Sequence, residues 1–386
     1  MSLYPEFDRI IDRSNTGSLK WQRYAGRDIL PMWVADMDFA VPDVVLDGVR
    51  KRVDHGILGY SVAHPGVLDA IVNYLKDEHE VAAAEPSWIA FTPGMVPAKT
   101  QAALLAGQPG DALMVCTPAY PPFLNIHKST QRELITVPLK EISSEPLQFS
   151  LDFEAMEAAV TPRTKLFYLC NPHNPVGRVF TKAEVEQVAD FCVRHDLLLV
   201  SDEIHCDLLL EPETTPHTTA LRLSGPIQER LIVLMAASKT YNIPGLSCSF
   251  AVIPDATLRR RFISAKTTFI AEVNPLGYHA TEAAYRDGRP WRTKLQQYLR
   301  GNRDLLANFL KEKAPQIRMP HMEATYLAWL DVRALNLDAP QQHFESHGLG
   351  FSPGQDFGGP GHVRLNFGCP RATLEEALRR FEKAIS

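Results

Sequence analysis

Four polar or aromatic side chains of this sequence follow short apolar runs, at positions where buried strands would end. In chain order they are Tyr120 after residues 112–116, Asn174 after 165–170, Asp202 at the end of 197–202, and Lys239 after 231–237. The carboxyl ends of parallel strands share one sheet edge, and ligands bind beyond that edge. The pattern therefore predicts one site that combines an aromatic ring, an amide, a carboxylate and an amine.

Two more segments add groups to this edge. Gly94, Met95 and Val96 follow another apolar run and predict a glycine turn into a helix. The first N–H groups of such a helix can bind a phosphate. Near the C-terminus, Arg364 can hold a substrate carboxylate through a bidentate pair.

These are the groups that pyridoxal 5′-phosphate (PLP) needs. Lys239, with Ser238 beside it, would bond to the aldehyde of the cofactor. Asp202 would keep the pyridine nitrogen protonated, so that the ring withdraws electrons. Asn174 would donate to the phenolate oxygen, and Tyr120 would stack on the ring. We expect the pocket to lower the pKa of Lys239, which then serves as a base once released.

Each residue also has an ordinary structural interpretation. An isolated lysine is more often a surface residue, and Asn174 between two prolines could form an Asx turn. Asp202 could cap a turn, and Arg364 could be an exposed strand charge. The order of all these residues along one predicted sheet edge favours the PLP site over the separate interpretations.

The elements that must position these residues are seven continuously apolar runs, which suit a sheet covered on both faces. They are residues 88–92, 112–116, 133–137, 165–170, 197–202, 231–237 and 248–253. Helical patterns alternate with them. The clearest covers 181–195, where Thr181 and Glu184 predict a capping box. The alternation predicts an α/β fold, with a three-layer large domain around a mostly parallel seven-stranded sheet.

The pattern changes after about residue 285. A long polar helix over roughly 290–313 precedes apolar segments at 324–331 and 362–367, and we expect Thr373 and Glu376 to cap a final helix. This part is typical of a smaller α+β domain. The expected boundaries are 46–285 for the large PLP-binding domain, and 1–45 with 286–386 for the small domain.

Composition narrows the functional class. The 386 residues carry a formal net charge of −5, which argues against nucleic-acid binding, and the basic stretch at 259–262 is interpreted as a solvated helix face. The first residues contain acids and no long apolar stretch, so neither a signal peptide nor a membrane span is expected. The six scattered cysteines favour buried free thiols in a reducing cytoplasm.

The motifs "NPHNPVG", "SDEIH" and "SKTYNIPGL" resemble those of fold-type I PLP enzymes of the aminotransferase class I/II superfamily, and the likeness extends end to end. Asn174, Asp202, Lys239 and Arg364 occupy signature positions of that superfamily. Tyr60, in "LGYS", matches a tyrosine that reaches the partner subunit's phosphate in such enzymes. The resemblance therefore implies a PLP-dependent transferase-like fold and a homodimer with shared active sites.

The segments "MWVADMDF", "GYS" and "SDEIHCD" narrow the resemblance to cystathionine β-lyase-like C–S lyases of the MalY/PatB type. His205 stands where many aminotransferases have a tyrosine, so we expect it beside the cofactor. Ser247 stands where many have a phosphate-binding arginine. The resemblance also implies that Trp33, Tyr60 and Tyr120 shape the substrate pocket.

The expected function is β-elimination of L-cystathionine or a related cysteine S-conjugate to pyruvate, ammonia and a thiol, within methionine and cysteine metabolism. Transamination with a 2-oxo acid uses the same residues and stays open, and so does a regulatory binding role. A metal site on Asp202, His205 and Asp207 is disfavoured because neighbouring side chains on a strand point to opposite faces. The glycine-rich stretch 348–359 lacks the context of a dinucleotide site.

Overall fold

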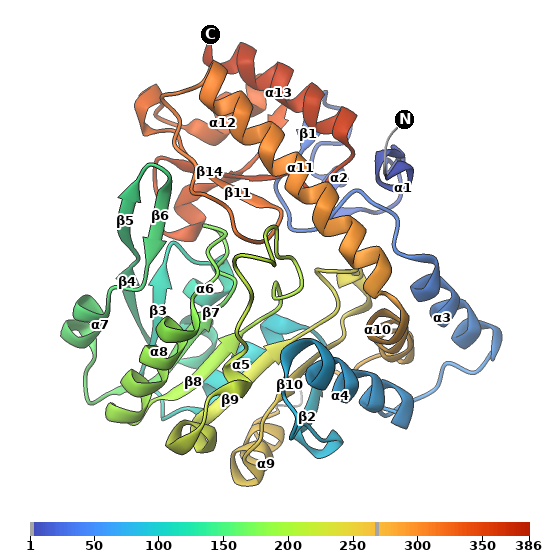
Figure 1. The fold of residues 1–386 in the computed structure, drawn as a ribbon, viewed down its shortest axis with the longest axis vertical. Helices are drawn as coiled ribbons and strands as arrows, with labels where there is room; N and C mark the ends of the chain where they lie inside the picture. Colours follow the sequence, from blue (N-terminus) through green and yellow to red (C-terminus); the bar gives the residue numbers. More distant parts are fainter. Residues whose placement is uncertain (1–3, 267–269) are drawn as a thin grey trace.

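The computed structural model describes residues 4–266 and 270–386 and is built on one large sheet. The sheet has seven strands in the order β2-β10-β9-β8-β7-β3-β4 (Figure 1). Their bounds are β2 Ile89–Thr92, β3 Ala112–Thr117, β4 Glu133–Pro138, β7 Thr164–Cys170, β8 Leu198–Asp202, β9 Leu231–Met235 and β10 Ser249–Val252. The seven predicted strands are therefore confirmed, with ends that shift by up to two residues.

The sheet is mostly parallel, as predicted. Strands β4, β3, β7, β8 and β9 run parallel to one another, whereas β10 is antiparallel to both β9 and β2. Every residue of β9 is buried, which explains why its sequence is continuously apolar. The parallel strands end together, so the residues that follow β3, β7, β8 and β9 meet at one edge.

Helices cover both faces of the sheet and confirm the three layers. On one face, α5 (Met95–Leu105), α6 (Pro121–Thr130) and α9 (Ala256–Ser264) pack in a common core with the strands. The other face carries α4 (Pro65–His79), α7 (Phe153–Ala159), α8 (Lys182–Arg194) and α10 (Pro275–Asp287). The capping box of Thr181 and Glu184 at the start of α8 is confirmed. Helix α3 (Asp43–Asp54) lies against α10.

A second core joins the C-terminal part of the chain to the N-terminal segment (Figure 1, top). It contains the long helix α11 (Arg289–Lys313), the sheet of β11 (Leu327–Asp331), β14 (His362–Asn366) and β13 (Ser352–Pro353), and the helices α12 (Pro340–Ser346) and α13 (Arg371–Ile385). Strand β1 (Leu30–Pro31) pairs with β12 (Leu349–Gly350). Strands β5 (Lys140–Ser144) and β6 (Leu147–Ser150) form a separate two-stranded sheet. Helices α1 (Pro5–Asp8) and α2 (Leu19–Gln22) are short. The domain boundaries at 45/46 and 285/286 stay a proposal.

One predicted helix cap is wrong. Helix α13 begins at Arg371 after Pro370, so Thr373 lies inside its first turn and makes no cap. Glu376 instead accepts hydrogen bonds from Arg379 and Arg380 on the next turn, at 2.7 Å. Pro370 occupies the N-cap position instead, so the threonine-to-glutamate spacing lies inside the helix and not at its start.

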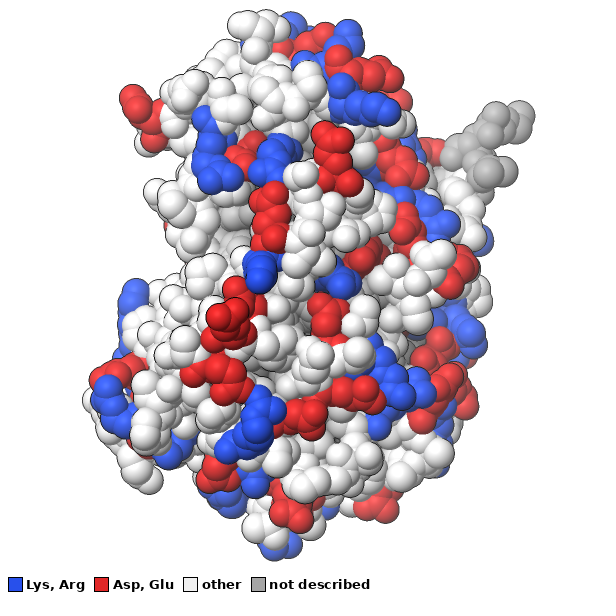
Figure 2. All heavy atoms as spheres, turned by 60° about the vertical axis from the view of Figure 1, so that its left-hand side comes forward, with Lys and Arg blue, Asp and Glu red and all other residues white. Residues whose placement is uncertain are grey.

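The surface and the cysteines agree with the composition. Acidic and basic side chains are mixed over the face shown in Figure 2. The stretch 259–262 lies on α9, with Arg260 and Arg261 exposed, as expected for a solvated helix face. All six cysteines are free and buried. Within the described residues, no helix is long and apolar enough to cross a membrane.

Candidate active site

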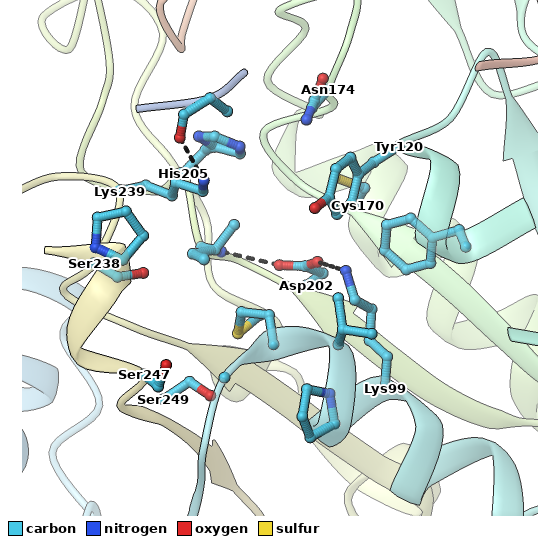
Figure 3. A pocket seen from close by; sticks show the side chains of 18 of the residues that line it. Lys99, Tyr120, Cys170, Asn174, Asp202, His205, Ser238, Lys239, Ser247 and Ser249 are labelled. Carbon is cyan, nitrogen blue, oxygen red and sulfur yellow. Dashed lines mark hydrogen bonds and ion pairs between the residues drawn. The ribbon is translucent and has the colours of Figure 1, made fainter. Parts of the chain in front are cut away.

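A cavity of about 270 Å³ opens at the carboxyl edge of the large sheet (Figure 3). Its volume is close to the roughly 300 Å³ at the lower end of typical ligand pockets. The sequence-predicted residues that line it are Gly94, Met95, Val96, Tyr120, Asn174, Asp202, His205, Ser238 and Lys239. Residues that lie far apart in the sequence are thus gathered by the ends of β2, β3, β7, β8 and β9.

Lys239 reaches the cavity from the turn that follows β9 (Figure 3). Its Nζ donates a hydrogen bond to the carbonyl oxygen of Ala35 at 2.5 Å. Burial, together with the positive charge of Arg364, lowers the pKa of Lys239 from 10.5 to about 8. Slightly above neutral pH, a substantial fraction of the molecules therefore carries Lys239 as the neutral, nucleophilic amine.

Asp202, the last residue of β8, is buried and holds two polar contacts. Its Oδ1 accepts from the backbone N–H of Ile204 at 3.2 Å. Its Oδ2 accepts from Nζ of Lys99 at 2.9 Å (Figure 3). Sequence reasoning missed Lys99, although it is the one charged residue of the mainly apolar helix α5, a signal that could have identified it.

Helix α5 begins at the cavity, where the sequence predicts an anion-binding corner. Gly94 caps the helix with a φ of +122°, a conformation that side chains rarely adopt, so only glycine suits this turn. The first N–H groups of the helix have no hydrogen-bond partners within it, and they lie at the positive end of the helix dipole. The hydroxyl-bearing Ser238, Ser247 and Ser249 also line the cavity (Figure 3). Three hydroxyl groups therefore line the cavity together with the start of α5.

Arg364, on β14, lies beside the cavity and is buried. Its Nη1 donates to Oδ1 of Asn174 at 3.1 Å, and its Nη2 donates to the carbonyl oxygen of Trp33 at 2.9 Å. The guanidinium carbon lies 4.5 Å from the centroid of the Phe357 ring. Among the residues that the structure describes, the Nε of Arg364 has no partner. The guanidinium is therefore fixed in place and keeps a donor free.

The indole of Trp33 contacts the N-terminal segment instead of the cavity. Its Nε1 donates to the carbonyl oxygen of Lys20 at 3.0 Å, and the guanidinium of Arg23 lies 4.6 Å from its ring. The lining residue that this segment contributes is Ala35. Trp33 thus reaches Arg364 through its backbone, a contact that the residue type could not indicate.

His205 and Tyr120 complete the predicted set. His205 is buried, and its pKa lies well below 6.5 because of burial and of the nearby charge of Lys239, so the ring is neutral. In the described parts of the chain, the Nδ1 of His205 has no hydrogen-bond partner. Tyr120 is the N-cap of α6, and its ring centroid lies 5.0 Å from Nζ of Lys99.

Tyr60, like Trp33 and Arg364, is a predicted site residue that does not line this cavity. It is fully exposed and belongs to a segment that also exposes Ile57, Leu58 and Val62. Its predicted contact with the phosphate of a partner subunit therefore stays a prediction.

Potential metal ligands gather elsewhere. In the described residues, three ligand atoms come within 4.8 Å of one another in His64, His279 and Glu282, and in His79, Cys206 and Asp207. Among the described residues, Asp202, His205 and Asp207 do not form such a group. Asp207 accepts a hydrogen bond from Nη1 of Arg292 at 2.7 Å.

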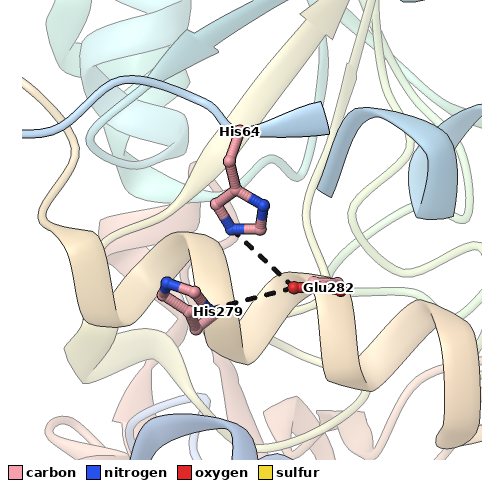
Figure 4. Close-up of side chains that lie close together, drawn as sticks. All are labelled: His64, His279 and Glu282. Atoms are coloured by element: carbon pink, nitrogen blue, oxygen red, sulfur yellow. Dashed lines mark ion pairs between the residues drawn. The ribbon is translucent and has the colours of Figure 1, made fainter. Parts of the chain in front are cut away.

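The first of these clusters lies between α4 and α10 (Figure 4). The Nε2 of His64 and the Nδ1 of His279 lie 3.7 and 3.9 Å from Oε2 of Glu282. The Nδ1 of His64 accepts from the N–H of Val67, which caps α4, and Arg286 pairs with the same glutamate. This cluster is therefore a polar contact between two helices, and the positive charge of Arg286 beside Glu282 disfavours a bound cation.

Comparisons with known proteins agree with this geometry. The profile of the family described as aminotransferase class I and II matches residues 29–381. Cystathionine β-lyase PatB of Bacillus subtilis (strain 168) is 35% identical over 391 residues, which span 98% of this chain and 100% of PatB. The structure of OvoB is similar with a TM-score of 0.93 and 40% identity, over 98% of this chain and 99% of OvoB. Cystalysin of Treponema denticola, which contains PLP, is similar with a TM-score of 0.92 and 32% identity, over 98% of each chain.

Proposed function

The chain belongs to the aminotransferase class I and II family, and from this membership we propose that it is a PLP-dependent carbon–sulfur β-lyase. The substrate would be L-cystathionine or a related cysteine S-conjugate, and the products pyruvate, ammonia and a thiol. The observation that carries the proposal is the convergence of Lys239, Asp202 and Asn174 in one cavity. The full-length similarity to PatB favours the lyase branch of the family.

The residues of the cavity fit PLP. The helix start at Gly94, with the neighbouring hydroxyls, would hold the phosphate. Asp202 would face the ring nitrogen, and Tyr120 would stack on the ring. The buried amide of Asn174, together with the unpartnered Nδ1 of His205 among the described residues, would face the phenolate oxygen. When bound, PLP supplies an electron-accepting ring that stabilises negative charge at the substrate Cα.

The protein groups then divide the work on the substrate. Arg364 would hold the α-carboxylate, because it is buried, fixed by two hydrogen bonds, and keeps a free donor. This contact fixes the orientation of the Cα–H bond. Nζ of Lys239, with a pKa of about 8, would take the Cα proton as its neutral amine. The Cβ–S bond then breaks, and its electron pair leaves with the sulfur.

The activity is tested with the PLP-loaded protein and L-cystathionine in the absence of a 2-oxo acid. Pyruvate and free thiol are followed over many turnovers, with Lys239→Ala as the inactive control. Equal and sustained amounts of both products are expected. If product forms only after a 2-oxo acid is added, the chain is an aminotransferase and the lyase proposal fails.

We further propose a homodimer with shared active sites. The exposed apolar segment around Tyr60, which includes Ile57, Leu58 and Val62, supports a covering partner surface. Light scattering of the PLP-loaded protein should report twice the mass of one chain. A Tyr60→Phe variant should bind PLP more weakly, and equal affinity in the variant would remove Tyr60 from the site.

The cysteines support a cytoplasmic location. All six are unpaired and buried, as suits a reducing compartment. Fractionation of cells that express the tagged protein tests this proposal, and recovery in a secreted or oxidising fraction would contradict it.

A further inference from the structure

Lys99 is a buried cation that lines the cavity but has no role in the proposed reaction. Its side chain is 1% exposed, and its Nζ lies 2.9 Å from Oδ2 of Asp202. Lys99 and Lys239 are the two basic side chains among the described residues that line the cavity, apart from the neutral His205. The amine of Lys239 has a chemical role, whereas the ammonium of Lys99 faces the carboxylate.

Stability alone does not explain a lysine at this position. The other buried residues of α5 are Ala98, Gln101, Ala102 and Ala103, and none of them is charged. Removing an ammonium and a carboxylate from water costs several kcal/mol per ion, which their mutual attraction only partly offsets. The rings of Phe123 and Tyr120, at 4.0 and 5.0 Å from Nζ, add cation–π contacts. The charge is therefore held in place beside Asp202 at a cost.

The geometry points to Lys99 as a positioning residue that acts through Asp202. It fixes the carboxylate toward the ring nitrogen of PLP and offsets part of its negative charge. The inference rests on the proposed PLP site. Lys99 holds Oδ2, and the N–H of Ile204 holds Oδ1, so the carboxylate has one fixed orientation.

Sharing the carboxylate weakens its hold on a second cation. A positive charge within a few ångströms disfavours another nearby proton, so the ring nitrogen binds its proton less tightly than beside Asp202 alone. The ring then withdraws electrons less strongly. The electron pair of the Cα–H bond would then pass into a Cα=Cβ bond while the Cβ–S electrons leave with the thiolate. Lys99 thus favours elimination over return of the proton to the cofactor, which would leave the amine on PLP.

The test uses holoenzyme loaded with PLP that carries ¹⁵N in the ring. The nitrogen signal is followed against pH in the wild type, in Lys99→Met, and in Lys99→Gln, which is neutral but can still donate to Asp202. Both neutral variants should lose the ring proton at a pH about one unit higher than the wild type. Lys99→Arg keeps the charge and should resemble the wild type. The glutamine variant keeps the test decisive if the methionine variant does not fold.

Repeating the measurement in an Asp202→Asn background distinguishes an effect of Lys99 through Asp202 from a purely structural role of Lys99. If Lys99 acts through Asp202, the shift caused by Lys99→Met disappears in that background. An equal shift in both backgrounds, or no shift in either neutral variant, overturns the inference. Failure of the lyase proposal looks different, since it appears as a demand for a 2-oxo acid and leaves the nitrogen signal unaffected.

Discussion

Replacing Lys239 with methionine should stabilise the PLP-free protein at neutral pH, although it abolishes activity. The structure lowers the pKa of Lys239 from 10.5 to about 8, mainly through burial and the charge of Arg364. Below pH 8, folding therefore buries a charged amine, and the loss of its hydration destabilises the folded state. At about 1.36 kcal/mol per pH unit, the difference corresponds to at most about 3.4 kcal/mol.

Two effects reduce this figure. The variant loses the hydrogen bond to the carbonyl oxygen of Ala35, worth about 1 kcal/mol. That oxygen keeps a partner, because the hydroxyl of Tyr326 donates to it at 3.1 Å. Lys239 is also half-buried and lies beside an open cavity, so solvent screens part of the penalty. We therefore expect a net gain of about 1–2 kcal/mol in the free energy of unfolding at pH 7.

The pH dependence gives the sign. A lysine with a lowered pKa binds more protons when unfolded, so the wild type gains stability as pH rises from about 8 to 10.5. The advantage of Lys239→Met should be constant below pH 8 and shrink across that window. Urea unfolding of both PLP-free proteins at pH 6 to 10 measures it, with Lys182→Met, at a 68% exposed lysine, as the matched control. A variant less stable than the wild type at pH 7, or an advantage independent of pH, would refute the reasoning.

Three further predictions concern groups around the cavity. Arg364→Lys should lower kcat/KM by about 10- to 100-fold through a raised KM, because one ammonium cannot replace a fixed bidentate donor; steady-state kinetics at saturating PLP measure this, and an unchanged KM would place the substrate carboxylate elsewhere. Asp202→Asn should cost about 3–5 kcal/mol of PLP-free stability by leaving Lys99 a buried, unpaired charge, and Lys99→Met in the same chain should restore much of the loss in urea unfolding; no restoration would mean that the pair is not coupled. Glu203 accepts hydrogen bonds from Ser201, Ala220 and His217, and although burial opposes ionisation, these contacts hold its pKa below 4.5. Glu203→Gln should therefore lower the free energy of unfolding above pH 4.5, with a difference that shrinks in more acidic solution, and a difference independent of pH would contradict a lowered pKa of Glu203.

The sequence predicted the large sheet because its strands are buried on both faces. Such strands form continuous apolar runs, as β9 does, and are easy to find without knowledge of their neighbours. Their order along the chain then placed Asn174, Asp202 and Lys239 at one edge, which is where the cavity lies. Local pattern and sheet topology carried the same information here.

Other features needed three-dimensional information. Helix α5 has no clear polar face, since Lys99, Thr100 and Gln101 follow one another among apolar residues, so its sequence does not indicate that Lys99 pairs with Asp202. The contact of Arg364 with the carbonyl oxygen of Trp33 uses backbone atoms, which no residue type specifies. The capping pattern at Thr373 was misleading because proline at 370 already sets the start of that helix. The sequence therefore predicted the helices and strands, but it did not predict the contacts between segments that are distant along the chain.

The central claim is that Lys239 in this cavity carries PLP, and covalent trapping tests it most directly. The PLP-loaded protein is reduced with borohydride, digested, and mapped by mass spectrometry. We predict that the added mass lies on the peptide containing Lys239, with Lys99 unmodified. The added mass on Lys99, the other lysine amine of the cavity, or on neither lysine, would contradict the account.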